Sequence, residues 1–180
     1  MMSLAAIELM VSLNFSDVPQ LGVAELLSLQ NAAEPVFLID VRAVEEYEVS
    51  RIPGAVLFDL AALEKNAKTA KSATHEALQS WQTLHQSIQL AQARQPEKKL
   101  HVVAYCSVGW RSSAFIRELK QKFPFTAKVS LYNLKGSIFK WSEQGYALEN
   151  ARGRTELVHG YAQPWVQLLP KEKRVLPNRQ

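Results

Sequence analysis

The sequence predicts an α/β domain with a central parallel β-sheet flanked by helices on both faces. Short apolar runs rich in β-branched residues, typical of buried strands, alternate with longer segments in which apolar residues recur at helical spacing. Strands that alternate with helices favour a parallel sheet, because each helix returns the chain to the end from which the next strand starts. With 180 residues, 47% of them hydrophobic, the chain suffices for one buried core and is cramped for two full domains.

The first half of the chain predicts one helix and two strands. Apolar residues at helical spacing over 23–30 indicate the helix, and the apolar run over 36–41 indicates the first buried strand. The sequence then turns polar. A turn at 52–54, which contains Pro53 and Gly54, precedes a second short apolar run over 55–58, which we predict to be the next strand.

The second half opens with the longest periodic segment of the chain. Its apolar residues recur every three or four positions over 73–94 and predict an amphipathic helix that ends before Pro96. We interpret His85, on that stripe, as a core or rim histidine. The elements expected after it are a strand over 100–105, a loop over 106–111, a helix from Ser112 until Pro124, a strand over 129–131 and a short helix over 138–144.

These elements divide the chain into three segments. We expect an N-terminal segment over 1–19, an α/β domain over 20–150 with an extra helix near 73–95, and a basic C-terminal extension over 151–180. The boundary falls near Asn150 because the alternation stops there. Six basic residues follow it, namely Arg152, Arg154, Lys171, Lys173, Arg174 and Arg179. We interpret them as a solvated basic tail, and we expect Tyr161, Trp165, Leu168 and Leu169 to pack against the domain.

Composition also limits the expected partners and compartment. The net charge is +4, but no motif with interleaved aromatic and basic residues accompanies it, so we do not expect a nucleic-acid partner. The apolar start of the chain lacks a basic flank, contains Glu8 and is too short to span a bilayer. We therefore expect a cytoplasmic protein with no membrane partner.

The one cysteine, Cys106, stands where a predicted strand gives way to a loop and a helix. An isolated buried cysteine is more often a small apolar residue than a nucleophile, so the loop decides between the two interpretations. Successive backbone N–H groups of the loop and the positive end of the helix are expected to converge above the sulfur, and Gly109 allows the loop to curl. Together with the charge of Arg111, this field favours a thiolate and lowers the cysteine pKa.

At this point the sequence resembles the rhodanese-like sulfurtransferase family over about 20–150. Four residues separate Cys106 from Arg111, as in the family's active-site loop. The blocks that resemble the family are Leu38-Ile39-Asp40-Val41-Arg42, Glu46-Tyr47 and Arg51-Ile52-Pro53-Gly54-Ala55 before the loop, and Leu134-Lys135-Gly136, Trp141 and Gly145-Tyr146 after it. One departure is Ser50-Arg51, where the family commonly has Gly-His. The order of the blocks makes the likeness stronger than any single motif.

The resemblance implies a role for each residue of the loop. Cys106 is the expected nucleophile that carries sulfur as a persulfide, moving it from a small anionic donor such as thiosulfate to a thiol, protein or cyanide acceptor. The substrate-binding loop is expected to comprise Ser107, Val108, Gly109, Trp110 and Arg111, with Arg111 holding the anionic donor. Asp40 and Arg42 are expected to be structural or rim residues. No cofactor is required, and the four scattered histidines predict no metal site.

Two other functions stay open on the sequence. A cysteine-dependent phosphatase or arsenate reductase would use a similar loop, although such loops have five residues between cysteine and arginine. A non-catalytic rhodanese-type module that binds a partner is the alternative from another class. The intact loop favours catalysis, because a purely structural domain has no need of this cysteine and arginine.

Overall fold

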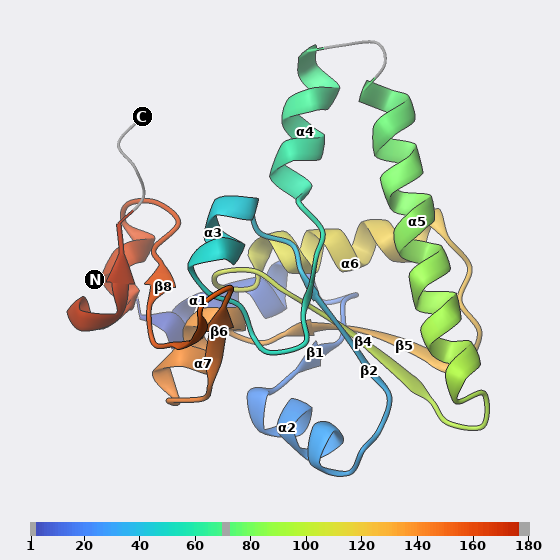
Figure 1. The fold of residues 1–180 in the computed structure, drawn as a ribbon, viewed down its shortest axis with the longest axis horizontal. Coiled ribbons are helices and arrows are strands. Elements are labelled where there is room, and N and C mark those ends of the chain that lie inside the picture. The colour runs from blue at the N-terminus through green and yellow to red at the C-terminus, as the bar shows by residue number, and fades with distance from the viewer. Residues whose placement is uncertain (1–2, 70–72, 177–180) are drawn as a thin grey trace.

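The computed structural model describes residues 3–69 and 73–176, and its core is a five-stranded parallel sheet (Figure 1). The strands are β1 (Gln20–Leu21), β2 (Val36–Asp40), β3 (Val56–Leu57), β4 (Leu100–Tyr105), β5 (Val129–Leu134), β6 (Leu148–Asn150), β7 (Gly153–Thr155), β8 (Val158–His159) and β9 (Arg174–Val175). The helices are α1 (Leu4–Asn14), α2 (Val23–Asn31), α3 (Val44–Val49), α4 (Leu60–Thr69), α5 (Ala73–Arg94), α6 (Trp110–Lys122) and α7 (Ser137–Glu143), with 3₁₀ turns η1 (Trp165–Leu168) and η2 (Lys171–Lys173).

The strand order of the main sheet determines where a ligand site can form. The order is β1-β5-β4-β2-β3, and every pair is parallel. The chain moves outward from β2 to β3 and then returns to β4, so β2 and β4 lie at a reversal of the strand order. In open α/β sheets, ligands bind outside the carboxyl ends of strands at such a reversal. Cys106 directly follows β4 at that end.

Helices cover both faces of the sheet, as the sequence predicts. On one face, Trp81 of α5 stacks on Phe115 of α6 with ring centroids 5.1 Å apart. On the other face, His101 of β4 and Tyr132 of β5 stack under α2, with centroids 6.0 Å apart. Side chains alternate between the two covered faces along each strand, so five of the six β4 residues are buried and His101 is half-buried.

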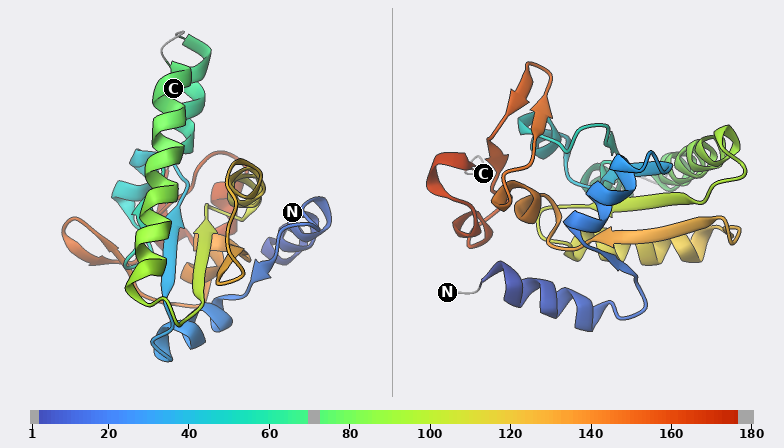
Figure 2. Two further views of the ribbon diagram at one scale, coloured as in Figure 1. Left: turned by 90° about the vertical axis from the view of Figure 1, so that its right-hand side faces the viewer. Right: turned by 90° about the horizontal axis from the view of Figure 1, so that it is seen from below.

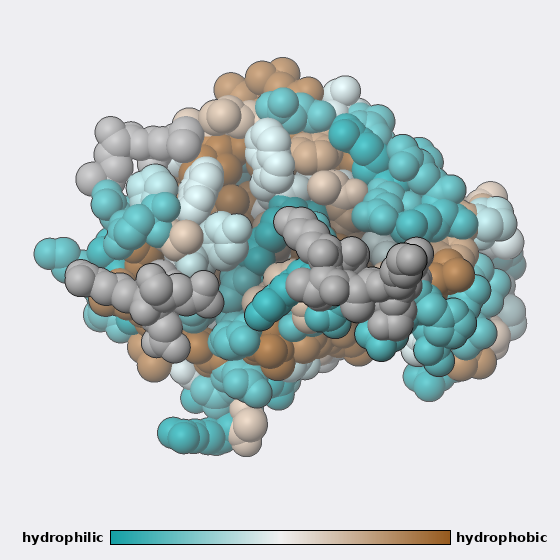
Figure 3. Space-filling view, turned by 90° about the horizontal axis from the view of Figure 1, so that it is seen from above, coloured by the Kyte–Doolittle hydropathy of each residue, from teal (hydrophilic) through white to brown (hydrophobic). Residues whose placement is uncertain are grey.

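The helices α4 and α5 form a hairpin that projects from the sheet (Figure 1). Only the part of α5 near the sheet contributes to the core, through Trp81, Leu84 and Ile88. Seen from above the hairpin, hydrophilic residues cover much of the surface, and apolar residues gather in patches between them (Figure 3). No helix among residues 3–69 and 73–176 combines the length and apolar character needed to cross a membrane.

The two terminal segments lie at the same end of the molecule (Figure 2). α1 packs through Ile7 and Val11, which are buried. The C-terminal segment is tied down by parallel pairing of β8 with β9 and by burial of Val166 and Leu169. Both segments therefore belong to the packed structure.

The strands and the long helix predicted from apolar runs are confirmed, with small shifts at their ends. The predicted helix over 73–94 and strand over 100–105 match α5 and β4. β5 continues past the predicted 129–131 to Leu134, because polar Asn133 pairs with Gln20 of β1. α6 begins at Trp110 rather than Ser112, since Gly109 in a left-handed conformation starts it. His85 is half-buried and stacks on Phe123, as expected of a rim histidine.

The C-terminal extension differs from a solvated tail. β6 and β7 form a hairpin across the expected boundary near Asn150. Lys173 Nζ donates a hydrogen bond to the Ser142 carbonyl at 2.9 Å, and Arg174 Nε donates one to the Leu169 carbonyl at 2.7 Å. The solvated interpretation is wrong for these two residues, because their charged groups satisfy backbone carbonyls. Arg179 lies outside the described residues.

Candidate active site

The loop that carries Cys106 is shaped by one glycine. Gly109 has φ of +105°, a region that side chains with a Cβ rarely adopt, and a Cβ built there would lie 3.1 Å from Asn133 Nδ2. The glycine lets the chain turn back and enter α6, so that the Gly109 N–H points at Cys106 Sγ, 3.2 Å away. The sulfur therefore lies inside the turn at the helix N-terminus.

Several groups act on the ionisation of the Cys106 thiol. Burial raises its pKa, whereas the charge of Arg111 and hydrogen bonds from Ser112 and from the Gly109 N–H lower it, and the pKa of Cys106 lies below its ordinary value. The Ser112 hydroxyl is also near the sulfur, but its one proton is donated to Asn133 Oδ1 at 2.6 Å. Arg111 and the backbone donors thus favour the thiolate.

The other side of the loop is held by α7. The Cys106 N–H donates to Ser137 Oγ at 3.1 Å, and Ser137 Oγ donates in turn to the Leu134 carbonyl at 3.2 Å. The N–H groups of Ile138 and Phe139 donate to the carbonyls of Cys106 and Ser107, at 3.2 and 3.1 Å. These bonds fix the loop to the strand β5 and the helix α7, and Cys106 itself is buried.

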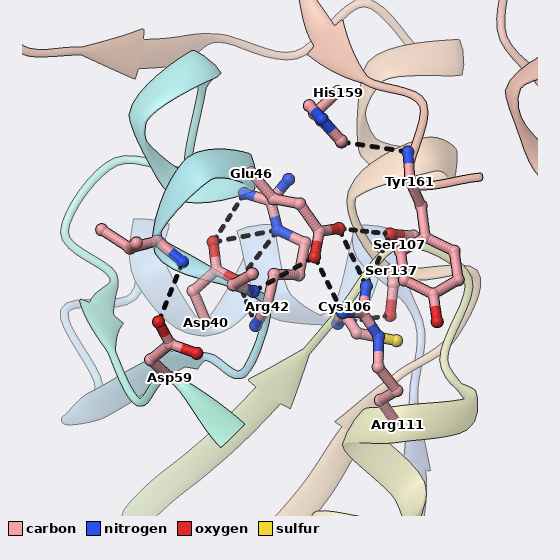
Figure 4. Close-up of polar contacts among 12 residues, drawn as sticks. Asp40, Arg42, Glu46, Asp59, Cys106, Ser107, Arg111, Ser137, His159 and Tyr161 are labelled. Carbon is pink, nitrogen blue, oxygen red and sulfur yellow. Dashed lines mark hydrogen bonds and ion pairs between the residues drawn. The ribbon is translucent and has the colours of Figure 1, made fainter. Parts of the chain in front are cut away.

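Arg111 is engaged by a carboxylate of α3. Its Nη1 and Nη2 donate to the two oxygens of Glu46 at 2.8 and 2.9 Å, and Nη2 also donates to Ser107 Oγ at 2.9 Å (Figure 4). Burial of Glu46 raises its pKa, but the charge and hydrogen bonds of Arg111 outweigh burial and lower it, so the carboxylate is ionised. The Tyr161 ring covers the guanidinium, 4.2 Å from its centre. The positive charge next to Cys106 is thus paired.

Asp40 and Arg42 form a second ion pair, at the end of β2, with both side chains fully buried. Arg42 Nε and Nη2 donate to the Asp40 carboxylate, and Nη2 also donates to the Ser50 carbonyl at 2.6 Å. Neither residue lines the cavity above Cys106. The pair joins the end of β2 to the chain after α3, the element that supplies Glu46.

A cavity of about 340 Å³ lies above the loop. Five of its lining residues come from the loop and the start of α6, namely Cys106, Ser107, Val108, Trp110 and Arg111. The other four are Ile7 and Met10 of α1 and Tyr161 and Trp165 of the C-terminal segment. The size suits a small organic group next to the sulfur.

The structure brings the predicted loop residues together and adds partners that the sequence analysis missed. Ser107, Val108, Trp110 and Arg111 all line the cavity with Cys106, and Gly109 forms the turn. Glu46 was named only in a block that resembles the family and Tyr161 only as a packing residue, and Ser137 was not named. None of the three was given a role at the loop, because each lies far from it in sequence. Within the described ranges, no three His, Cys, Asp or Glu side chains gather into a group that could hold a metal ion.

Comparisons with known proteins give the family context. The family model described as rhodanese-like domain matches residues 22–144. A Synechococcus elongatus protein described as an uncharacterized 16.5 kDa protein in the psaL 5′ region is 39% identical over 57 residues, which are 31% of this chain and 38% of that protein. The chain thus matches well under half of that relative's length.

Two solved structures resemble the fold. The thiosulfate sulfurtransferase from Pseudomonas aeruginosa has a TM-score of 0.53 at 20% identity, covering 84% of this chain and 23% of that one. A yeast protein tyrosine phosphatase of the rhodanese family has a TM-score of 0.55 at 18% identity, covering 70% of this chain and 85% of that one. At these identities the likeness is one of fold alone. The family-model match spans more than half of the chain, and the chain belongs to the rhodanese-like domain family.

Proposed function

We propose that the protein is a sulfurtransferase that moves a sulfane sulfur through a persulfide on Cys106. The Cys106 thiolate attacks the outer sulfur of a donor, the bond from that sulfur to the rest of the donor breaks, and the leaving group departs with the electron pair. An acceptor thiolate or cyanide then attacks the outer sulfur of the persulfide. The thiolate of Cys106 is regenerated, and no net oxidation occurs.

The observation that carries this proposal is the position of Cys106 Sγ at the base of the cavity with the Gly109 N–H aimed at it, 3.2 Å away. The thiolate is favoured by the loop and by Arg111. A persulfide is also an anion when its outer sulfur is deprotonated, so the backbone donors of the loop suit the intermediate as well as the thiolate. The chain has one cysteine, so the sulfur must leave to an external acceptor. The cytoplasm, where thiols stay reduced, is the compartment we propose.

The donor class depends on Arg111. From the sequence, Arg111 is expected to bind an anion such as thiosulfate, whereas in the structure its Nη1 and Nη2 both donate hydrogen bonds to Glu46. A donor would have to displace that carboxylate to form a bidentate contact with Arg111. We therefore propose a sulfane-sulfur donor and leave thiosulfate as a candidate that the Glu46 pair disfavours.

The same pair bears on the phosphatase or arsenate reductase alternative. A phosphoryl or arsenate group needs a cation and N–H donors arranged around three oxygens. Here four residues separate Cys106 from Arg111, and the arginine is already paired. If the protein is instead a non-catalytic module that binds a partner, Cys106→Ser should leave that binding unaffected.

Transfer of sulfur to cyanide tests the proposal. The control is Ser113→Ala, because Ser113 is a buried serine of α6 that does not line the cavity. The parent protein, Cys106→Ser and Ser113→Ala would be given a sulfane-sulfur donor and cyanide, and thiocyanate formation would be measured, with aryl phosphate hydrolysis in parallel. We expect thiocyanate from the parent and from Ser113→Ala and none above background from Cys106→Ser. Phosphate release that depends on Cys106, with no thiocyanate, would establish the phosphatase alternative instead.

A further inference from the structure

The cavity above Cys106 is lined almost entirely by apolar and aromatic side chains. Apart from the three reactive or polar loop residues, its lining consists of Ile7, Met10, Val108, Trp110, Tyr161 and Trp165. Small-molecule sites of this kind hold an organic group by contact with apolar walls and fix it with a few polar groups. Here the polar groups all lie on the floor, where Cys106, Ser107 and Arg111 meet.

The charge at the floor does not favour an anionic substrate. Among the described residues that line the cavity, Arg111 is the one basic side chain, and Glu46 neutralises it through two short hydrogen bonds. Once Cys106 is a thiolate or a persulfide, the three groups together carry one net negative charge. A carboxylate or a dianion that enters the cavity therefore meets repulsion that a neutral group does not.

Two of the walls come from segments outside the family match of 22–144. α1 supplies Ile7 and Met10, and the C-terminal segment supplies Tyr161 and Trp165. The apolar cavity is thus a feature that this chain adds to the loop with its own terminal segments.

The wall from the C-terminal segment is held in place before any substrate binds. Tyr161 has φ of +62°, an uncommon conformation for a tyrosine, and its N–H donates to His159 Nδ1 at 3.1 Å. Burial holds the pKa of His159 below its ordinary value, which keeps this nitrogen an acceptor. The Tyr161 ring then lies over the Arg111 guanidinium, with its centroid 4.2 Å from the guanidinium carbon (Figure 4). Strain of this sort persists where the surrounding structure determines the conformation.

We infer that the sulfur acceptor of this protein is a thiol that carries an aromatic or branched alkyl group and no charged substituent. This inference rests on the proposed sulfur transfer and adds the class of acceptor. The thiol gives its proton to solvent, and its apolar group lies between α1 and the rings of Tyr161 and Trp165. The resulting thiolate attacks the outer sulfur of the Cys106 persulfide at the floor. The S–S bond to Cys106 breaks, the acceptor leaves as a persulfide, and Cys106 returns to the thiolate.

A single-turnover measurement separates this inference from the proposed function. The protein would be loaded with a small persulfide whose alkyl group carries no charge, desalted and mixed with benzyl mercaptan, mercaptoethanol or mercaptoacetate. Loss of the extra sulfur atom would be followed by intact mass, and each rate would be divided by that of the same thiol with a free alkyl persulfide. We expect benzyl mercaptan to be favoured over mercaptoacetate by roughly ten-fold, the size of one good aromatic contact.

Two pairs of variants locate the preference. Tyr161→Ala should lose most of the preference for benzyl mercaptan, because Tyr161 lines the cavity. Tyr146→Ala is the matched control and should retain the preference, because Tyr146 is similarly exposed, at 38% against 41%, but does not line the cavity. On α1, Met10→Lys should shift the preference toward mercaptoacetate and Leu9→Lys should not. Both α1 residues are exposed, so these variants are expected to fold even if Tyr161→Ala does not.

The outcomes are distinguishable. Failure of Cys106 to take up sulfur would overturn the proposed function and this inference together. Uptake followed by equal normalised rates for the three thiols, or a preference that Tyr161→Ala and Met10→Lys leave unchanged, would overturn the inference alone.

Discussion

Replacing Asp40 by asparagine removes the counter-charge of a fully buried arginine. Arg42 donates three hydrogen bonds to the Asp40 carboxylate, at 2.9, 3.2 and 2.6 Å, and neither side chain is exposed. Burial disfavours the charged guanidinium, but the carboxylate outweighs burial and keeps the pKa of Arg42 above its ordinary value, so the arginine stays charged. Asparagine preserves the shape of the side chain but leaves that charge unpaired.

The expected loss of stability follows from burial. Removing one partner of a buried ion pair costs about 3–5 kcal/mol. For a chain of this size, about 2–4 °C of melting temperature corresponds to each kcal/mol, so the midpoint should fall by roughly 6–20 °C. The same change at Asp17 serves as the matched control. Asp17 also pairs with an arginine, Arg117, through two hydrogen bonds, but both side chains are exposed. Water screens that pair, so Asp17→Asn should leave the midpoint almost unchanged.

Thermal and urea unfolding followed by circular dichroism measure both variants. The reasoning is refuted if Asp40→Asn and Asp17→Asn shift the midpoint by the same small amount. A normal alkylation rate of Cys106 in folded Asp40→Asn would agree with a structural role for the pair, because neither Asp40 nor Arg42 lines the cavity.

Four further predictions concern the loop and its partner Glu46. Iodoacetamide should alkylate Cys106 at pH values below the ordinary cysteine range, and Arg111→Ala should move that profile to higher pH; an unshifted profile in the parent would contradict the lowered pKa of Cys106. Glu46→Gln should free the charge of Arg111 and raise the rate with thiosulfate relative to an uncharged donor, and a lower relative rate would show that the Glu46 pair does not exclude anions. Because the pKa of Glu46 is lowered in the folded protein, its ionisation stabilises the fold fully above the ordinary value of 4.5, and this stabilisation is lost as pH falls through the lowered value. Glu46→Gln should therefore make the free energy of unfolding depend less on pH below 4.5. An unaltered slope of unfolding free energy against pH would refute this prediction. Gly109→Ala should cost about 1–3 kcal/mol in urea unfolding and slow alkylation, since its φ of +105° is strained for alanine, and a neutral change would mean that the turn does not depend on glycine.

The parts of the fold that sequence analysis could predict are those with a local signal. The apolar runs of β2 and β4 and the stripe along α5 are periodic on their own. β1 is only two residues long and exists because it pairs with β5, and the short helix α3 depends on Asp59, whose carboxylate accepts the Val44 N–H at 3.1 Å. Such partners are distant in sequence, so no local pattern indicates them.

The candidate site likewise has a part with a local sequence signal and a part whose residues are distant in sequence. The loop from Cys106 to Arg111 is contiguous, and its spacing predicted a nucleophile in a turn before a helix. The partner of Arg111 lies 65 residues earlier, and the Tyr161 ring that covers it belongs to a segment beyond the predicted domain. The sequence therefore indicated Arg111 as a cation that could bind an anion, and only the folded structure shows that Glu46 pairs with it.

The most direct test of the account is the intact mass of the protein before and after a sulfane-sulfur donor. The parent should gain the mass of one sulfur atom. The loaded protein should lose that mass when one sample is treated with a reductant and when another is treated with an acceptor thiol. Cys106→Ser should gain no mass. A parent protein that gains no sulfur, or a Cys106→Ser variant that gains as much as the parent, would contradict the claim that Cys106 carries the sulfur.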